Sequence, residues 1–367
     1  MTLTNYWWLL IWLFLGGAIF RNMPKRRERL NGEIVEHWDV LPAILMVVPY
    51  ILWAGFRHDY FGDTALYRKF FLATDPNLFN LFAPFVNGEK DPGFESYMIL
   101  MRAILGDSDK LFFLLIAAFQ LICIALVFRR YSTNYWACVF LFVASTDYLS
   151  WMHNGMRQFI AVALIFSGFR YLANRQYARM ILLILLASLF HGSALLMVPI
   201  VFIVHGHAWN RKTILMLAVT AVVIAYIDQF SPILNNLLQD TQYDNLINNE
   251  TWAADDGANI IRVAVYSVPA LLSLFGLKYI RSANNPIMDI CINCSIVTMA
   301  LYLVASVSSG IYIGRLPIYT TLQGYMALPW MIDQIFESKS ARLVRFGMYG
   351  AYLAFFYFQM HFAWGAI

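Results

Sequence analysis

Charged residues are scarce in this sequence, and their scarcity excludes an ordinary soluble domain. Only 13% of the 367 residues are charged, whereas 60% are hydrophobic and the mean hydropathy is +0.59. Soluble domains carry roughly 25% charged and about 45–50% apolar residues. Apolar runs of roughly 17–20 residues, the length that crosses a bilayer, recur along the chain. The composition therefore indicates a polytopic membrane protein without a sizeable soluble domain.

Cysteine is also rare, and the first apolar run lacks the features of a leader. The four cysteines fall within apolar runs, and the single C-x-x-C of Cys291 and Cys294 predicts packing residues rather than a redox or metal site. Residues 5–20 have no basic residue before them and no small-residue cleavage site after them. We therefore expect a first transmembrane helix there and not a removed signal peptide.

The apolar runs predict an all-α membrane domain over residues 1–367, with about twelve transmembrane helices. Counts of eleven and thirteen are the alternatives, because the sixth helix is short. The predicted helices are 5–20, 39–55, 111–127, 135–150, 155–172, 180–189, 193–206, 213–227, 262–278, 289–307, 316–333 and 343–360.

The positions of Lys and Arg predict the orientation of these helices. Of the 26 Lys and Arg residues, 17 lie in the short turns that follow every second helix, beginning with the first. Because basic turns face the cytoplasm, we expect both termini and the two long segments, 56–110 and 228–261, on the outer side. Segments of that length without structure are uncommon unless they have a function. Two amphipathic stretches in 56–110 predict interfacial or re-entrant helices, or helices that only cover the bundle.

Outside 56–110, the outer side carries only three basic residues, Arg157, Arg262 and Arg315, each within about one turn of a predicted helix start. His191 stands just before another helix start. Helix N-termini present unpaired N–H groups and the positive end of the dipole, and Arg matches the geometry of phosphate. We therefore predict that these residues hold one polyanion jointly. The alternative is that each arginine extends to lipid headgroups.

Local backbone signals agree with these helix starts. Asn154 and Ser193 are residue types that favour N-caps, and Pro317 fits a first helical turn. Gly62 permits a tight bend in the stretch "GFRHDYFGDTALY" (55–67).

Carboxylates gather in the first long segment. The stretch 55–67 brings Arg57, Asp59 and Asp63 close together, and "DPGFESYMIL" (91–100) adds Glu95. Carboxylates near phosphate and sugar suit general-base catalysis or hydroxyl binding. The alternative is that Asp59 or Asp63 pairs with Arg57.

Taken together, these stretches resemble a known family. Four stretches occur in the order found in the EpsG-like branch of the Wzy polysaccharide polymerases. They are an arginine followed by a Gly-Asp-Thr-x-x-Tyr turn ("RHDYFGDTALY"), then "PGFE", "NGMRQFIA" and "LASLFHGSALL". The resemblance covers residues 50 to about 205, and "YIGRLPIY" (312–319) extends it more weakly. It implies a bacterial inner-membrane glycosyltransferase with an all-helical, GT-C-like fold and a periplasmic active face. Such enzymes transfer a glycan chain from undecaprenyl diphosphate to a sugar hydroxyl of another lipid-linked repeat unit, with inversion expected.

With this resemblance, the basic residues receive a role at the donor. The residues expected to hold its diphosphate and stabilise the charge that leaves are Arg157, Arg262, Arg315, His191 and Gln158. We expect neither a metal nor a cofactor, because these cations already supply positive charge. The expected partners are lipid-linked oligosaccharides, the bilayer, a chain-length regulator and a flippase, and no nucleic acid.

The acidic segment receives the second role. Asp63 or Glu95 would accept the proton of the acceptor hydroxyl, and Arg57 would bind the acceptor diphosphate or position Asp63. The other residues expected to bind substrate are Tyr67, Asn154 and Tyr319. The second long segment, 228–261, shows no motif and is expected to select the sugars.

Three other functions remain as alternatives. An O-antigen ligase or another polyprenyl-linked glycosyltransferase would use the same chemistry with a different acceptor. A lipid-linked oligosaccharide flippase or other transporter would carry charges or broken helices near the middle of the membrane, where this sequence is almost uncharged. A membrane acyltransferase would use His191 as a base.

Overall fold

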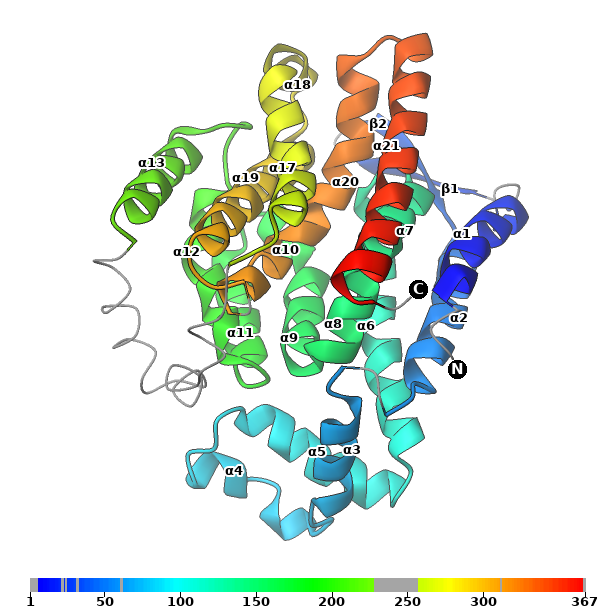
Figure 1. The fold of residues 1–367 in the computed structure, drawn as a ribbon, viewed down its shortest axis with the longest axis vertical. Helices are drawn as coiled ribbons and strands as arrows, with labels where there is room; N and C mark the ends of the chain where they lie inside the picture. The colour runs from blue at the N-terminus through cyan, green and yellow to red at the C-terminus, as the bar shows by residue number, and fades with distance from the viewer. Residues whose placement is uncertain are drawn as a thin grey trace. The chain divides into compact units, whose positions relative to one another are not determined.

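The computed structural model describes residues 6–20, 23, 25–30, 33–59, 62–227, 257–310 and 312–365, and of 28–30 and 33–35 the backbone only. Contacts within the chain divide it into two compact units (Figure 1). The first unit comprises Met1–Arg170, Leu182–Ala194 and Phe336–Ile367, and the second comprises Tyr171–Ile181 and Leu195–Ile335. The single membrane domain expected from the sequence stays a prediction, and the segment 228–261 lies outside the described residues except for 257–261.

The first unit is helical apart from one hairpin of two antiparallel strands. Its elements are α1 (Trp7–Phe20), β1 (Lys25–Leu30), β2 (Glu33–Trp38), α2 (Val40–Gly55), α3 (Thr64–Ala73), the 3₁₀ turn η2 (Leu78–Asn80), α4 (Ala83–Val86), α5 (Pro92–Leu105), α6 (Asp109–Tyr131), α7 (Tyr135–Ala144), α8 (Asp147–Asn154), α9 (Met156–Ser167), α21 (Ser338–Phe358) and the π-helical turn η5 (Gln359–Ala363). Three short elements lie across the unit boundaries: α10 (Phe169–Ala173), α11 (Tyr177–Ser188) and the 3₁₀ turn η3 (Gly192–Leu196).

Helix α6 is the centre of the first unit. It packs against α2 and α9 along its length and touches α3 and α5 near its start and β2 near its end. Gly55 makes the approach of α2 to α6 close, because a Cβ at this position would lie 2.7 Å from the Leu114 side chain. Apolar residues on all sides of α6 therefore find partners in several neighbouring elements.

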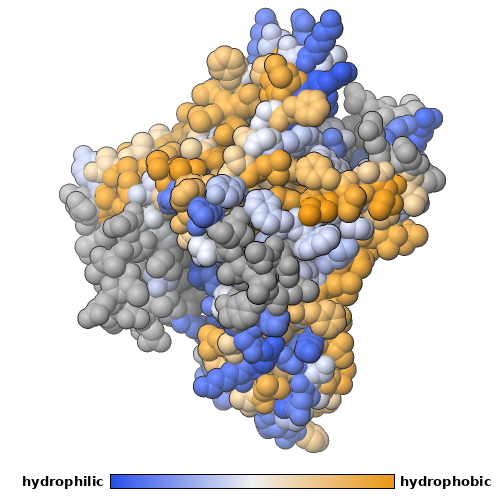
Figure 2. Space-filling view, turned by 45° about the vertical axis from the view of Figure 1, so that its right-hand side comes forward, coloured by the Kyte–Doolittle hydropathy of each residue, from blue (hydrophilic) through white to orange (hydrophobic). Residues whose placement is uncertain are grey.

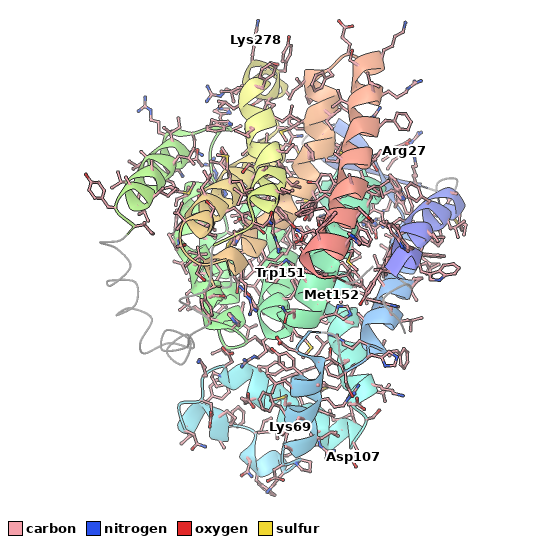
Figure 3. All side chains as sticks on the ribbon, viewed as in Figure 1. Arg27, Lys69, Asp107, Trp151, Met152 and Lys278 are labelled. Atoms are coloured by element: carbon pink, nitrogen blue, oxygen red, sulfur yellow. The ribbon has the colours of Figure 1, made fainter. Side chains whose placement is uncertain are left out.

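The segment 56–110 folds as helices α3, η2, α4 and α5, as its amphipathic stretches predict. Its apolar side chains share one core with α6 and α9. The buried members of this core are Tyr67, Phe71, Phe94, Met98, Phe112, Phe113, Ile116, Met156 and Ile160. Arg68 of α3 forms ion pairs with Asp59 and with Asp109 at the start of α6, so charges and apolar packing fix the segment to the same helix. Lys69 and Asp107 of this segment, labelled in Figure 3, are exposed.

The second unit is also helical. Its described elements are α12 (Met197–Ile203), α13 (Arg211–Ala225), α17 (Ile260–Phe275), α18 (Leu277–Ala283), α19 (Pro286–Ser306), the 3₁₀ turn η4 (Ile313–Arg315) and α20 (Ile318–Ile335). Helix α19 contacts α13, α17 and α20, and it begins at a proline after the N-cap Asn285, whose side chain accepts from the amides of Ile287 and Met288.

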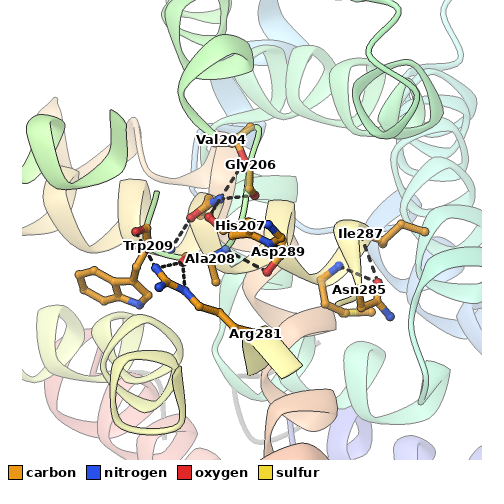
Figure 4. A network of polar contacts seen from close by, with 11 residues as sticks. Val204, Gly206, His207, Ala208, Trp209, Arg281, Asn285, Ile287 and Asp289 are labelled. Atoms are coloured by element: carbon orange, nitrogen blue, oxygen red, sulfur yellow. Dashed lines mark hydrogen bonds and ion pairs between the residues drawn. The ribbon is translucent and has the colours of Figure 1, made fainter. Parts of the chain in front are cut away.

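A network of polar contacts fixes the turn that precedes α13 (Figure 4). The Asp289 carboxylate accepts from the Ala208 amide at 2.9 Å, and Asn293 Oδ1 accepts from the Trp209 amide at 3.0 Å. Arg281 donates to the carbonyls of Ala208 and Trp209 at 3.1 and 3.2 Å. Side chains of α18 and α19 thus satisfy backbone groups of a turn in which Trp209 adopts a positive φ of 58°.

Among the described residues, two helices have the length and composition of membrane spans, and a bent pair of helices would make a third. The two long ones are α6 and α19, and α17 with α18 form an apolar pair bent by 75°. Shorter apolar helices are α1, α2, α7, α9, α11 and the η3–α12 pair. Apolar side chains cover much of the surface visible in Figure 2. The chain is therefore a membrane-embedded protein of predominantly helical fold, whereas the count of twelve spans stays a prediction.

Some local predictions are wrong. The helix expected over 262–278 is bent by 75° between α17 and α18. The helix expected over 135–150 is broken into α7 and α8 at Thr146, whose φ is 67°. The Ser145 hydroxyl bonds to the Phe142 carbonyl there, a local bond that competes with continuation of the helix. The basic stretch 21–32, expected as a simple turn, instead contributes strand β1, which pairs with β2 from Lys25↔Trp38 to Leu30↔Glu33.

Candidate active site

The site begins at the break between α8 and α9, where the chain passes through His153, Asn154 and Gly155. Gly62 has a positive φ of 55° and lies against this break, because a Cβ there would be 2.9 Å from the His153 carbonyl oxygen. The side-chain amide of Asn154, oriented with its nitrogen toward Asp63, donates to the Asp63 carboxylate. The Asn154 nitrogen lies 3.2 Å from each carboxylate oxygen. The Gly-Asp-Thr turn is therefore held on the Asn-Gly turn that starts α9.

A second contact joins the Pro-Gly-Phe-Glu turn to the end of α11. The Gly93 amide donates to the Leu189 carbonyl at 2.9 Å, and a Cβ on Gly93 would lie 2.7 Å from the Leu189 Cβ. Only glycine fits at this approach without displacing a side chain. The four stretches that carry the family resemblance thus meet at one place in the first unit.

Arg157, in the first turn of α9, lies where these stretches meet. Its Nη1 donates to Asp91 Oδ2 at 2.8 Å, and its Nε donates to the Tyr67 hydroxyl at 3.2 Å. The guanidinium also lies over the rings of Tyr67 and Phe94, at 5.9 and 5.8 Å from their centroids. Arg157 therefore faces a carboxylate and aromatic rings of its own unit. The alternative, in which this arginine contacts only lipid headgroups, does not describe these contacts.

The ion pair of Arg157 is buried on one side only. The Asp91 side chain is 1% exposed, whereas that of Arg157 is 32% exposed. Burial raises the pKa of Asp91, and Arg157 and the Gly192 amide lower it in part. A buried carboxylate thus fixes an arginine whose side chain stays partly exposed to solvent.

Glu95 lies in the electrostatic field of the same pair. Burial raises the pKa of this carboxyl, Arg157 opposes the shift, and Glu89 and Asp91 add to it. Glu95 is in the first turn of α5, so its backbone is fixed by the helix that carries Phe94 in the core. A carboxyl whose pKa is moved toward neutrality is suited to proton transfer.

His191 joins the group through a hydroxyl. The Ser193 Oγ lies 2.7 Å from His191 Nδ1 and accepts from Gln158 Nε2 at 3.3 Å. Gln158 directly follows Arg157 in α9, so the first turn of this helix is joined to His191 through Ser193. The structure thus places Arg157, Gln158 and His191 in one region of the first unit, and their joint binding of a diphosphate stays a prediction.

Some predicted local contacts are wrong. Arg57 donates to the carbonyl oxygens of Ala54 and Met152, both at 2.5 Å, and lies over the Phe113 ring, while Asp59 pairs with Arg68. Of the alternative, in which Asp59 or Asp63 pairs with Arg57, the part that concerns Asp59 is therefore wrong for these described residues. The Arg57 side chain secures α8 to α2 and α6, and its binding of an acceptor diphosphate stays a prediction.

The predicted caps also differ from those observed. Asn154 ends α8, and Gly155 is the N-cap of α9. Ser193 lies inside the 3₁₀ turn η3 and bonds to His191 and Gln158 instead of capping a helix. Pro317 directly precedes α20, and its carbonyl accepts from the amides at the helix start.

Three predicted residues belong to the second unit. Arg262 is in the first turn of α17, with its guanidinium over the rings of Tyr266 and Tyr302 at 5.6 and 5.9 Å. Arg315 ends η4, and Tyr319 is buried in α20. Arg157 and Arg262 do lie at helix starts, but the sharing of one anion among the four cations stays a prediction.

Sequence reasoning missed Asp91. It is the N-cap of α5, yet its side chain makes no cap bond in that helix and binds Arg157 instead. The Asp-Pro pair at a helix start could have marked it, because Asp is favoured at N-caps and Pro at the next position. Among the residues that the structure describes, no group of three or more His, Cys, Asp or Glu side chains could hold a metal ion. The expectation of no metal and no cofactor stays a prediction.

Comparisons with known proteins give one match. Neither the curated proteins nor the solved structures contain one that matches the chain. A family model described as "EpsG family" matches residues 40–365, nearly the whole chain and both units. Proteins of this kind are polymerases of the Wzy type, so membership indicates a polysaccharide polymerase-type glycosyltransferase. The family match confirms the resemblance carried by the four stretches, and the chain belongs to the EpsG family.

Proposed function

We propose that this protein transfers a glycan chain from undecaprenyl diphosphate to a sugar hydroxyl of another lipid-linked repeat unit, at the periplasmic face of a bacterial inner membrane and with inversion. The observation that carries the proposal is the half-buried Arg157, fixed by Asp91 and Tyr67 beside Glu95. Such a transfer needs a cation for the leaving diphosphate and a base for the attacking hydroxyl. Arg157, held in place before substrate arrives, supplies the cation, and the neighbouring carboxyl with a raised pKa supplies the base.

Arg157 binds the donor diphosphate in this proposal. Its N–H groups that do not face Asp91 donate to phosphate oxygens, and the start of α9 adds backbone N–H groups. Because Asp91 offsets the charge of Arg157, the diphosphate needs further hydrogen-bond donors besides this arginine. His191 adds a hydrogen bond from the chain that runs through Ser193. These groups stabilise the negative charge that collects on the diphosphate as it leaves.

Glu95 acts as the general base. It takes the proton of the acceptor hydroxyl while that oxygen attacks the anomeric carbon of the donor sugar. The bond from the anomeric carbon to the diphosphate oxygen breaks on the opposite face, and its electron pair leaves with the diphosphate. Asp63 is less suited to this step, because the Asn154 amide lies within hydrogen-bond distance of both of its oxygens. Asp63, Tyr67 and Asn154 bind sugar hydroxyls instead.

The decisive experiment uses the purified protein with a defined undecaprenyl-diphosphate oligosaccharide. Donor binding and polymer formation are measured separately for Arg157→Gln, Arg157→Lys and the control Lys69→Gln, which removes an exposed cation of α3. We expect roughly 30- to 1000-fold slower polymerisation with Arg157→Gln, the cost of about 2–4 kcal/mol for one lost contact in the transition state. Lysine should rescue poorly, because a point charge lacks the planar fork. Polymer at the wild-type rate from Arg157→Gln would overturn the proposal.

Two further variants test whether the second unit shares the diphosphate. Arg157→Gln combined with Arg262→Gln should cost distinctly less than the sum of the single losses, because residues that act on one group are not additive. Additive losses would separate Arg262 from the donor site. Products of the same reaction distinguish the other functions: a polymer ladder from lipid-linked units alone supports a polymerase, and transfer that requires a lipid A core would identify a ligase.

A further inference from the structure

The first unit exposes an apolar turn that the proposed polymerase reaction does not use. This apolar tip, residues 76–88, lies between α3 and α5 and contains η2 and α4. The tip carries no charged residue, and Asp75 and Glu89 flank it. Its large exposed residues are Leu78 at 54%, Phe79 at 98%, Phe82 at 70%, Phe85 at 42% and Val86 at 85%. The three phenylalanines alone expose the equivalent of about two complete residues, roughly 300–500 Å², which is the size of the largest apolar patch on a typical soluble monomer.

Local hydrogen bonds fix the backbone of the apolar tip. Asn77 Oδ1 accepts from the Phe79 amide at 3.1 Å, and Asn80 Nδ2 donates to the Asp75 carboxylate at 3.1 Å. Because η2 has three residues and α4 has four, neither element can turn a whole side toward a core, and of their residues only Pro84 is buried. A defined turn therefore presents the apolar side chains to the surroundings.

The apolar tip is joined to a side of α5 that is itself apolar. Ser96 Oγ donates to the Leu81 carbonyl at 2.7 Å, so this side of α5 faces the tip. Residues four positions apart share one side of a helix, and Leu100 and Ile104 follow Ser96 at this spacing. Both are exposed, so apolar surface continues from the tip along α5.

Helix α6, which follows α5 after a short turn, exposes a similar stripe. Leu111, Leu115 and Phe119 are exposed and lie four positions apart, on one side of the helix. Because α6 is long and apolar enough to cross a membrane, this stripe is suited to contact hydrocarbon. Along the chain, exposed apolar residues thus lead from the tip through α5 into a candidate span.

The chemistry of the apolar tip fits lipid better than a glycan or a second protein. A sugar site needs polar groups that meet the hydroxyls, whereas Asn77 and Asn80 bond within the turn. A second protein would cover the tip alone, whereas the apolar surface extends along α5. Uncharged aromatic and aliphatic side chains of this kind enter the boundary between headgroups and acyl chains.

We propose that the apolar tip inserts into the lipid bilayer and holds α5 at the membrane surface. Glu95 directly precedes Ser96 in α5, so an inserted tip keeps this carboxyl near the depth of lipid phosphates. That consequence for catalysis rests on the proposed function, whereas the insertion itself does not.

Fluorescence quenching on the full chain tests the insertion without a measurement of polymerisation. The protein is placed in vesicles of phosphatidylethanolamine and phosphatidylglycerol that contain a nitroxide-labelled lipid. A bimane label is attached in Phe79→Cys and in the control Lys69→Cys, an exposed position of α3. The unsubstituted chain gives the background, because its own cysteines are buried or half-buried. We expect the label at residue 79 to be quenched by the lipid and shielded from iodide, and the label at residue 69 to show the reverse.

A second substitution in the Phe79→Cys protein tests whether apolar side chains drive the insertion. Phe82→Ser should shift the tip about tenfold toward water, because burial of one phenylalanine side chain in hydrocarbon favours insertion by about tenfold or more. Phe82→Leu should retain the lipid quenching, and both variants should fold, since Phe82 is exposed. Equal effects of serine and leucine would overturn the proposal.

Three other results would also overturn the insertion. Equal access of iodide to residues 69 and 79 would place the tip in water. Shielding from iodide without quenching by the lipid would show that protein covers the tip, either a second copy or another segment of this chain. Shielding that develops only when lipid-linked oligosaccharide is added would assign the tip to the glycan.

Discussion

Replacing Asp91 with asparagine tests whether this buried carboxylate positions Arg157. The substitution keeps the shape of the side chain and an acceptor oxygen, but it removes the charge that faces Arg157 Nη1 at 2.8 Å. A hydrogen bond to a charged group contributes about 1.5–3 kcal/mol. Two effects reduce the expected loss of unfolding free energy: the Arg157 side chain is 32% exposed and can gain water, and Asp91 no longer pays the desolvation that raises its pKa. We therefore expect a loss of at most about 2 kcal/mol, seen as a Tm lower by a few degrees in detergent.

Polymerisation should fall much further than stability. With Asp91 replaced, the guanidinium keeps a weaker hydrogen bond to the neutral amide oxygen, the Tyr67 hydroxyl at 3.2 Å and two rings, so it can move by an ångström or more. A displacement of about 1 Å in a positioned group costs on the order of 100-fold in rate. The assay is polymer formation from a defined lipid-linked oligosaccharide, with donor binding measured in parallel. Asp107→Asn is the matched control, because it removes a carboxylate that is 83% exposed in its pair with Arg102.

The double variant Asp91→Asn/Arg157→Gln completes the argument. If Asp91 acts through Arg157, then its replacement should cost nothing further once Arg157 is gone, so the coupling should be nearly as large as the single effect. Wild-type rates from Asp91→Asn would refute the reasoning. So would strictly additive losses in the double variant, because Asp91 would then act on something other than Arg157.

Three other outcomes follow from the structure. Gly62→Ala should slow polymerisation about tenfold or more and lower the free energy of unfolding by about 1–3 kcal/mol, because the φ of Gly62 is 55° and the new Cβ would lie 2.9 Å from the His153 carbonyl. The control Gly88→Ala, with φ 68° and no atom within 4 Å, should show only the cost of its backbone conformation. Equal effects of the two variants would refute the close approach at Gly62. The polymerisation rate should fall as the pH is lowered and Glu95 gains its proton. Because burial raises the pKa of Glu95, this fall should be centred above the ordinary value of 4.5. A Glu95→Gln variant that shows the same fall would exclude Glu95 as the base. A cysteine at Arg130 should react with an impermeant reagent only after the membrane is breached, whereas one at Asp107 should react in intact spheroplasts; the reverse pattern would invert the predicted orientation.

The helices themselves could be predicted from the sequence, because their cause is local. Apolar runs of sufficient length predict helices where the structure has α2, α6, α9 and α19, and the ends differ by only a few residues. Where the prediction of 135–150 failed, the polar residues Ser145, Thr146 and Asp147 interrupt the apolar run, and the hydrogen bond of Ser145 and the positive φ of Thr146 end the first helix there. Hydrophobic pattern does not contain that information.

The sequence by itself also determined the family resemblance, since the four motif stretches, with Arg157 and His191 among them, stand out by residue type and order. Only the tertiary structure decided what these residues face. Asp91 lies 66 positions from Arg157 in the chain, and Gly93 meets Leu189 across a still longer separation. Such pairs depend on how α5 packs in the core of α6 and α9, and packing of distant segments leaves no periodicity in the sequence. For the same reason Arg57, which reads as a substrate-binding cation, is committed to the backbone carbonyls of Ala54 and Met152. A charge shows in the sequence, whereas its partner is set by the fold.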